Sequence, residues 1–135
     1  VFLLNSIFYI PIMNYQIDAT NKILGRLSSE VVILLRGKNT SQFDPSKLPP
    51  HTVTVYNTNL LKVTGKKMDG KEGKVYLHHT GFHRGQRAET LKEVMMRDSR
   101  IALRRAVMGM LPKNRMRNQI IKHLILIKND LKNSI

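Results

Sequence analysis

Strand-like and helical patterns alternate along residues 15–128, and this alternation constrains the fold more than any other feature of the sequence. Tyr15–Ala19 is a short apolar run, and Thr52–Tyr56 is β-branched and aromatic, which favours strands. Between them, apolar residues recur at three- and four-residue spacing from Leu24 to Leu35, which indicates an amphipathic helix. Strands that alternate with helices are typical of an α/β domain with parallel strands. We expect one such domain, since 135 residues leave no room for two ordinary cores.

Capping residues predict both ends of the first helix and the start of the second. Thr20 and Asn21 can cap the first helix, and Gly37 ends it. Thr90 and Glu93 are three residues apart and predict a capping box at the start of a second helix.

Residues 98–110 predict a third helix, with a basic side and an apolar side. Asp98 or Ser99 caps this helix. Its expected apolar face consists of Leu103, Ala106, Val107 and Met110.

The remaining segments divide into loops and extended runs. Thr40–His51 contains three prolines and is therefore expected to be a loop. Leu60–Thr64 and Leu124–Lys128 have the composition of strands. Gly65–Gly73 is a charged connector rich in glycine, and Lys74–His79 follows it as a further strand, so we expect a projecting ribbon here.

The positive charge of the chain favours a polyanionic partner. Lys and Arg total 23 against 9 Asp and Glu, a net charge of +14. Residues 1–21 contain one acid, Asp18, and no Lys or Arg, so their charge of −1 leaves +15 for the rest of the chain. A surplus of this size repels itself unless a polyanion compensates it.

Part of this charge lies between Arg97 and Lys128, where the sequence contains six arginines and three lysines but only one acid, Asp98. The planar fork of arginine binds phosphate oxygens through two hydrogen bonds, so the run indicates a nucleic-acid interface. The alternative is a basic helix surface that is only solvated.

Three imidazoles, those of His78, His79 and His83, lie close together in the sequence. Such spacing can mark a metal site. The glycines among them disfavour a helix that would place them on one face, and no carboxylate lies nearby. We therefore expect no metal here, and instead a loop that presents its imidazoles with Arg84 and Arg87 to phosphates.

The sequence lacks the patterns that would indicate hydrolytic or transfer chemistry. It has no nucleophile elbow, no phosphate-binding P-loop and no acid pair in an apolar setting, and it has no Cys. We therefore expect no enzyme activity, no cofactor and no small-molecule substrate. A metal-dependent enzyme that uses the three histidines is the minor alternative.

The first twelve residues, VFLLNSIFYIPI, are mostly apolar but contain Asn5, Ser6 and Pro11. The run is too short for a membrane span and lacks the basic residues of a secretory or mitochondrial signal. We expect an apolar N-terminal extension over residues 1–14, a single domain over residues 15–130 and a C-terminal tail over residues 131–135.

Four sequence blocks occur in a familiar order: IDATNKILGRLSSEVVILLRGK, VYNTNLLKVTGKK, KVYLHHTG and VMGMLPKN. In these blocks the chain resembles the family of bacterial-type large-subunit ribosomal protein thirteen, and the resemblance covers Tyr15 to Asp130. It implies a three-layer α/β/α fold with a small, mostly parallel sheet of about four strands. The chain departs from the family pattern at Arg84, Met108 and Arg117.

The resemblance also implies a structural protein that binds large-subunit ribosomal RNA early in assembly, beside neighbouring ribosomal proteins and away from membranes. The implied location is a cytoplasmic ribosome, with a mitochondrial or plastid ribosome as the alternative. A DNA- or RNA-binding regulator outside the ribosome is the competing function. The family's RNA contacts fall here on Lys22, Arg26, Arg36, Lys38, His78, His79, Thr80, Gly81 and Lys113. The charge pattern adds His83, Arg84, Arg87, Arg100, Arg104, Arg105, Arg115, Arg117 and Lys122.

Overall fold

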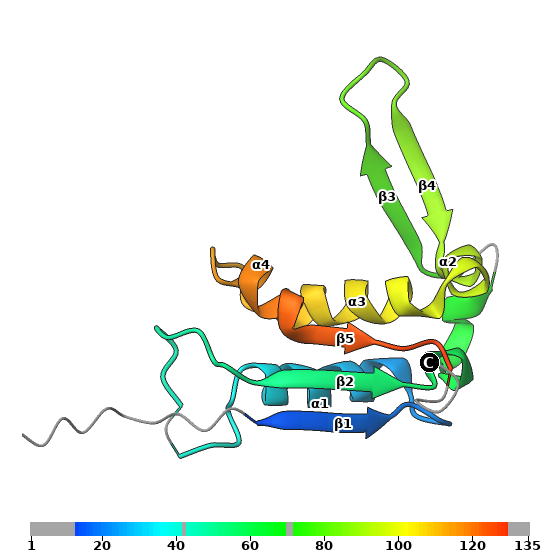
Figure 1. Ribbon diagram of the computed structural model, residues 1–135. Helices are drawn as coiled ribbons and strands as arrows, with labels where there is room; N and C mark the ends of the chain where they lie inside the picture. The colour runs from blue at the N-terminus through cyan, green and yellow to red at the C-terminus, as the bar shows by residue number, and fades with distance from the viewer. Residues whose placement is uncertain (1–12, 42, 70–71, 130–135) are drawn as a thin grey trace, which may run out of the picture.

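A small parallel sheet and two long helices form the body of the protein (Figure 1). The computed structural model describes residues 13–41, 43–69 and 72–129. The sheet has the strand order β1-β2-β5, and both strand pairs are parallel. The strands are β1 (Asn14–Asp18), β2 (Thr52–Tyr56) and β5 (Leu124–Leu126), and the helices are α1 (Leu24–Leu35), α2 (Leu91–Arg97), α3 (Ser99–Met110) and α4 (Arg117–Ile120). The expected single α/β domain with a small, mostly parallel sheet is confirmed, but among the described residues this sheet has three strands where about four were expected.

The expected ribbon is also confirmed. β3 (Val75–His79) pairs with β4 (Gln86–Thr90) in a separate antiparallel sheet. Figure 1 shows this ribbon extending away from the body, next to α2. Within the connector before it, Gly65–Met68 forms a short 3₁₀ turn.

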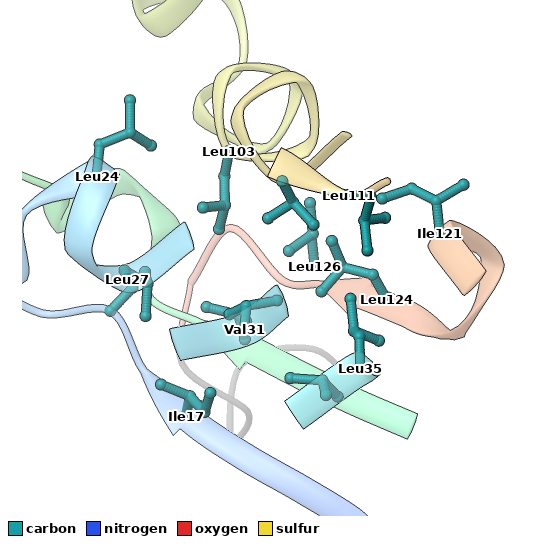
Figure 2. Close-up of a cluster of buried hydrophobic side chains, with 14 of the residues drawn as sticks. Ile17, Leu24, Leu27, Val31, Leu35, Leu103, Leu111, Ile121, Leu124 and Leu126 are labelled. Atoms are coloured by element: carbon teal, nitrogen blue, oxygen red, sulfur yellow. The ribbon is translucent and has the colours of Figure 1, made fainter. Parts of the chain in front are cut away.

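The main core lies between the sheet and the helices α1 and α3 (Figure 2). The strand register puts Ile17, Val55 and Leu126 in one row, and all three are buried. The neighbouring row contains Gln16 and Ile125, which are exposed, and Thr54, which is half-buried. Side chains alternate across a strand, so the helices cover one face of this sheet.

A second, smaller core holds the base of the ribbon. Leu91 and Val94 of α2 and Ala102 of α3 are buried together, and Tyr76 of β3 packs against them. The ribbon is therefore attached to the body through α2 and the first turns of α3.

Two of the expected local structures are wrong. Thr20 and Asn21 do not cap α1, because Thr20 donates its backbone N–H and its hydroxyl to the Asp18 carboxylate instead. The helix begins after Ile23, which makes no side-chain cap. The N–H of Leu24 donates to the carbonyl of Lys62 at 2.9 Å, so a distant segment performs this role.

The second error concerns Leu60–Thr64, which forms no regular strand. Thr58–Leu60 is a 3₁₀ turn, and beyond it Lys62 makes only an isolated bridge to Ile23. The cause is Asn57, whose φ of 59° lies in the left-handed region and turns the chain out of the sheet after β2.

The expected helix starts at Thr90 and Asp98 are confirmed. Thr90 and Glu93 form the capping box of α2, and the Asp98 side chain accepts the N–H of Arg100 at the start of α3. The apolar face of α3 differs from the expectation, since Met110 is 44% exposed and Ala102 is buried. Helix α3 contacts α2 as well as α1, and Ala102 is buried against Leu91 and Val94 of α2, so this additional neighbour moves the buried face.

The apolar extension expected over residues 1–14 lies outside the described residues except for Met13 and Asn14, and the expected tail over residues 131–135 lies outside them entirely. In the described ranges, no helix has the length and apolar character needed to cross a membrane.

Candidate nucleic-acid interface

The two faces of the β3–β4 ribbon carry different chemistry. The register pairs Tyr76 with Glu89 and His78 with Arg87. These four residues therefore share one polar face, which combines a phenol, a carboxylate, an imidazole and a guanidinium. Val75, Leu77 and His79 lie on the other face, opposite Thr90, Ala88 and Gln86. The structure thus brings the predicted contacts His78 and Arg87 together and separates both from His79.

The loop at the ribbon tip is built by internal hydrogen bonds. The N–H of Gly81 donates to Nδ1 of His79 at 2.9 Å, and the N–H of Thr80 donates to the carbonyl of Gly85 at 2.9 Å. His79 thus helps to form the turn, while its Nε2 takes no part in that bond. The predicted contacts Thr80, Gly81, His83 and Arg84 are all exposed here.

At the base of the ribbon, Glu89 binds two arginines of the body. Arg97 lies 2.6 Å from Oε1 of Glu89, and Nη1 of Arg105 donates to Oε2 at 3.0 Å. The guanidinium of Arg105 also lies 4.8 Å from the centre of the Tyr76 ring. The hydrogen bond from Arg105 and the charges of both arginines lower the pKa of Glu89. Arg105 therefore joins α3 to the ribbon, in addition to its predicted role in RNA contact.

Two hollows connect these cations into one surface. A hollow of about 590 Å³ is lined by the polar face of the ribbon together with Arg97 and Arg105. A second hollow, of about 410 Å³, is lined by Arg100, Arg104 and Arg105. Because Arg105 lines both, the ribbon and α3 form a continuous basic surface, which we call the ribbon–α3 surface. Its cations are Arg87, Arg97, Arg100, Arg104 and Arg105, and the imidazole of His78 and the carboxylates of Glu89 and Asp98 line the same hollows.

Not every predicted cation carries an unpaired charge. Arg100 binds both carboxylate oxygens of Asp98, through contacts of 2.9 to 3.1 Å. This pairing lowers the pKa of Asp98 and raises that of Arg100. Lys22 is paired with Glu30 at 3.2 Å. Among the described residues, Arg104 forms no ion pair, so it is the strongest candidate on α3 for a phosphate contact.

A second basic region lies at the end of α1. The guanidinium of Arg36 lies 5.5 Å from the centre of the Phe43 ring. Arg36 and Phe43 line a hollow of about 400 Å³ together with Lys47, which is exposed. A smaller hollow is lined by Arg36 together with Pro112 and Asn114. The predicted Arg36 and the segment of Lys113 are therefore neighbours in space.

The other predicted contacts are accessible. Arg117 is half-buried at the first residue of α4. The exposed positions are Arg26, Lys38, Lys113, Arg115 and Lys122.

Three contributors to these surfaces were not among the predicted contacts: Arg97, Lys47 and Tyr76. Arg97 belongs to the arginine-rich run, so its type and place were visible in the sequence. Lys47 lies in a proline-rich loop, and only the fold puts it near Arg36. Within the described ranges, no group of three or more His, Cys, Asp or Glu side chains is placed to hold a metal ion.

The fold and the exposed cations define a basic α/β protein with a projecting ribbon, whose charged surface suits a polyanion. The chain matches the family model for ribosomal protein L13 over residues 13–132 and belongs to this family.

Relatives in bacteria agree with this assignment. The chain is 42% identical over 110 residues to the large ribosomal subunit protein uL13 of Finegoldia magna, covering 82% of this chain and 75% of that protein. It is 41% identical to the protein of the same name from Buchnera aphidicola subsp. Cinara cedri, with the same coverage. It is also 41% identical to that of Agathobacter rectalis, covering 83% of this chain and 77% of that protein.

Proposed function

We propose that this chain is a structural protein of the large ribosomal subunit that binds large-subunit rRNA and helps its early assembly. The observation that carries the proposal is the family match over residues 13–132, together with relatives named as large ribosomal subunit proteins. The net charge of +14 supports it, because rRNA is the polyanion that such a protein meets.

The proposed mechanism is phosphate neutralisation combined with recognition of shape. Exposed lysines and arginines displace counterions from the RNA backbone, which provides affinity without reading sequence. The ribbon and the turn after α3 fit the folded RNA, since the narrow major groove of A-form RNA hides most base edges from side chains. Arg104, Lys113 and Arg115 are exposed and form no ion pair among the described residues. They are the principal proposed phosphate contacts.

The cations that are paired with carboxylates contribute less directly to RNA affinity in this mechanism. Arg100 and Lys22 each lie beside a carboxylate that offsets part of their charge. Arg105 is bound to Glu89, and its proposed part in RNA binding is to position the ribbon. We therefore rank these three below Arg104 and Lys113 in their direct effect on RNA affinity.

The proposed domain for rRNA binding is residues 15–130. Neighbouring large-subunit proteins are its second class of partner, and neither a membrane nor a small-molecule substrate has a part in this role. The bacterial relatives favour a cytoplasmic ribosome over a mitochondrial or plastid one.

Binding of the full chain to a bacterial large-subunit rRNA transcript, measured at several salt concentrations, tests the proposal. If about eight phosphates are neutralised, the logarithm of the binding constant should fall with the logarithm of salt with a slope of about −6 to −7. An affinity that does not depend on salt would overturn this mechanism. Reconstitution of the large subunit with and without the protein tests its role in assembly, and equal rates of particle formation would contradict that role.

A further inference from the structure

The ribbon tip holds an aromatic side chain that the described protein does not use for packing. Phe82 lies in the loop between β3 and β4 and is 79% exposed, the largest exposure among the large apolar side chains of the described residues. It belongs to neither hydrophobic core. Figure 1 shows that this loop is the part of the ribbon farthest from the body. A phenylalanine in this position is available for contact with another molecule.

The loop around Phe82 has a defined conformation. The carbonyl of Phe82 accepts the N–H of Gly85 at 2.8 Å, and the N–H of Thr80 closes the turn on the carbonyl of Gly85. A Cβ atom at position 85 would collide with the hydroxyl of Thr80 and the carbonyl of Phe82, so the close turn requires glycine there. The ring is thus presented from an ordered turn, which reduces the entropy lost when it binds.

The surroundings of Phe82 favour a nucleic acid over an apolar partner. The sequence from Val75 to Ala88 contains no Asp or Glu, and Arg84 and Arg87 stand close to Phe82 along the chain. Both arginines are exposed. Proteins that bind single-stranded nucleic acid combine such cations, which contact the backbone, with aromatic rings on which bases stack. Unpaired bases in loops and bulges are the part of RNA that side chains reach in this way.

We propose that Phe82 stacks on an unpaired RNA base while the neighbouring arginines bind the phosphates beside it. The inference rests on the proposed function, and it adds a residue and a mode of recognition: the ribbon tip reads an unpaired nucleotide by stacking. It also predicts that the tip distinguishes RNA with unpaired bases from a perfect duplex of equal charge.

Affinity measurements on the full chain separate stacking from simple apolar contact. Phe82→Ala should weaken binding to a bacterial large-subunit rRNA transcript by about 5- to 150-fold, the range that corresponds to loss of one stacked base. Phe82→Leu keeps an apolar side chain without a planar ring and should be similarly weak, whereas Phe82→Tyr should bind nearly as well as the wild type. The salt slope should stay the same in all three, because no charge is lost. Arg87→Ala is the matched control, and it should reduce the slope by about one.

A fluorescence measurement provides a second readout that does not depend on affinity. The chain contains no Trp, so Phe82→Trp introduces a single reporter. Stacking on a base should quench its emission when the rRNA transcript is added. Met96→Trp is the control, since Met96 is 74% exposed on α2, outside the ribbon. A perfectly paired RNA duplex should quench neither reporter.

The outcomes distinguish this inference from the function on which it rests. If the wild-type protein does not bind the rRNA transcript, the proposed function fails. If the wild type binds with a steep salt dependence, but Phe82→Ala and Phe82→Leu bind equally well and the tryptophan at position 82 is not quenched, the stacking proposal alone is overturned. That result would assign the exposed ring to a protein neighbour.

Discussion

Arg105 of α3 donates a hydrogen bond of 3.0 Å to Glu89 of β4, and its guanidinium lies over the ring of Tyr76 on the neighbouring strand. One side chain of the body therefore contacts both strands of the ribbon. Arg104, the preceding residue of the same helix, is exposed and belongs to no ion pair among the described residues. Adjacent arginines thus have different roles, and this difference can be measured.

The first prediction concerns the position of the ribbon. Arg105→Ala should loosen the ribbon on the body, because it removes one of the two arginines that bind Glu89 as well as the contact with Tyr76. Amide hydrogen exchange in β3 and β4 should become faster, while exchange in β1 and β2 stays unchanged. Arg104→Ala is the control and should leave the ribbon amides as they are. Equal protection of the ribbon in both variants would show that Arg105 does not hold it.

The second prediction concerns RNA affinity. Arg104→Ala and Lys113→Ala should each weaken binding to the rRNA transcript and reduce the salt slope by about one, as expected for the loss of one phosphate contact. The melting temperature should hardly change, because both side chains are exposed. A variant that melts early, yet binds RNA normally per folded molecule, would assign the residue to the fold instead.

The third prediction compares two glycines near the ends of α1. Gly37 has a φ of +67°, and a Cβ atom there would lie 2.8 Å from Nε2 of His51. Gly37→Ala should therefore destabilise the protein by about 1–3 kcal/mol. Gly25 is in the first turn of the same helix and has no neighbouring atom within 4 Å of such a Cβ, so Gly25→Ala should stabilise by about 0.5–1 kcal/mol. Urea unfolding measures both changes, and effects of the same sign would refute the comparison.

The fourth prediction concerns pH. His51 is 2% exposed, and its Nδ1 has no hydrogen-bond partner among the described residues. Burial lowers the pKa of His51 below the value of 6.5 that it has when unfolded. As the pH falls below about 6.5, the unfolded chain therefore takes up a proton before the native protein does, and the free energy of unfolding decreases. Above that pH the contribution of neutral His51 to stability is fully present.

Replacement of this histidine tests the sign of the effect. His51→Leu should remove part of the decrease in unfolding free energy between about pH 7 and pH 5. His78→Gln serves as the control, since His78 is exposed on the ribbon. An unaltered pH dependence in His51→Leu would show that the buried imidazole does not contribute.

Local patterns in the sequence predicted much of the fold. The β-branched run at Thr52–Tyr56 forms β2 with the same bounds. Its alternate residues Val53 and Val55 are both buried in the main core, as the period of a strand predicts. The capping box at Thr90 and Glu93 formed as expected, since both hydrogen bonds lie within four residues. The interactions that decide these elements are local or depend on simple periodicity.

The failures occurred where a distant contact outweighed local preference. Thr20 was an acceptable cap by its residue type, but Asp18 accepts its hydrogen bonds and the carbonyl of Lys62 receives the N–H of Leu24. Likewise, the composition of Leu60–Thr64 favours a strand, yet Asn57 directs that segment away from the sheet. The position of Lys62 relative to α1 cannot be predicted from a local sequence pattern, because it depends on how distant segments pack.

The same division applies to the candidate interface. The sequence by itself determined that the chain is strongly basic, that its arginines gather between Arg97 and Arg117, and that a ribbon rich in glycine and histidine carries further cations. Net charge and short-range patterns are properties of the amino-acid sequence, so they can be determined without knowledge of the fold. The tertiary structure alone decided that Arg105 is bound by a carboxylate sixteen residues earlier, that Arg104 beside it is not, and that Phe82 stands exposed at the ribbon tip. Ion pairing and burial depend on which segments meet in space, and that is settled only when the strands and helices pack.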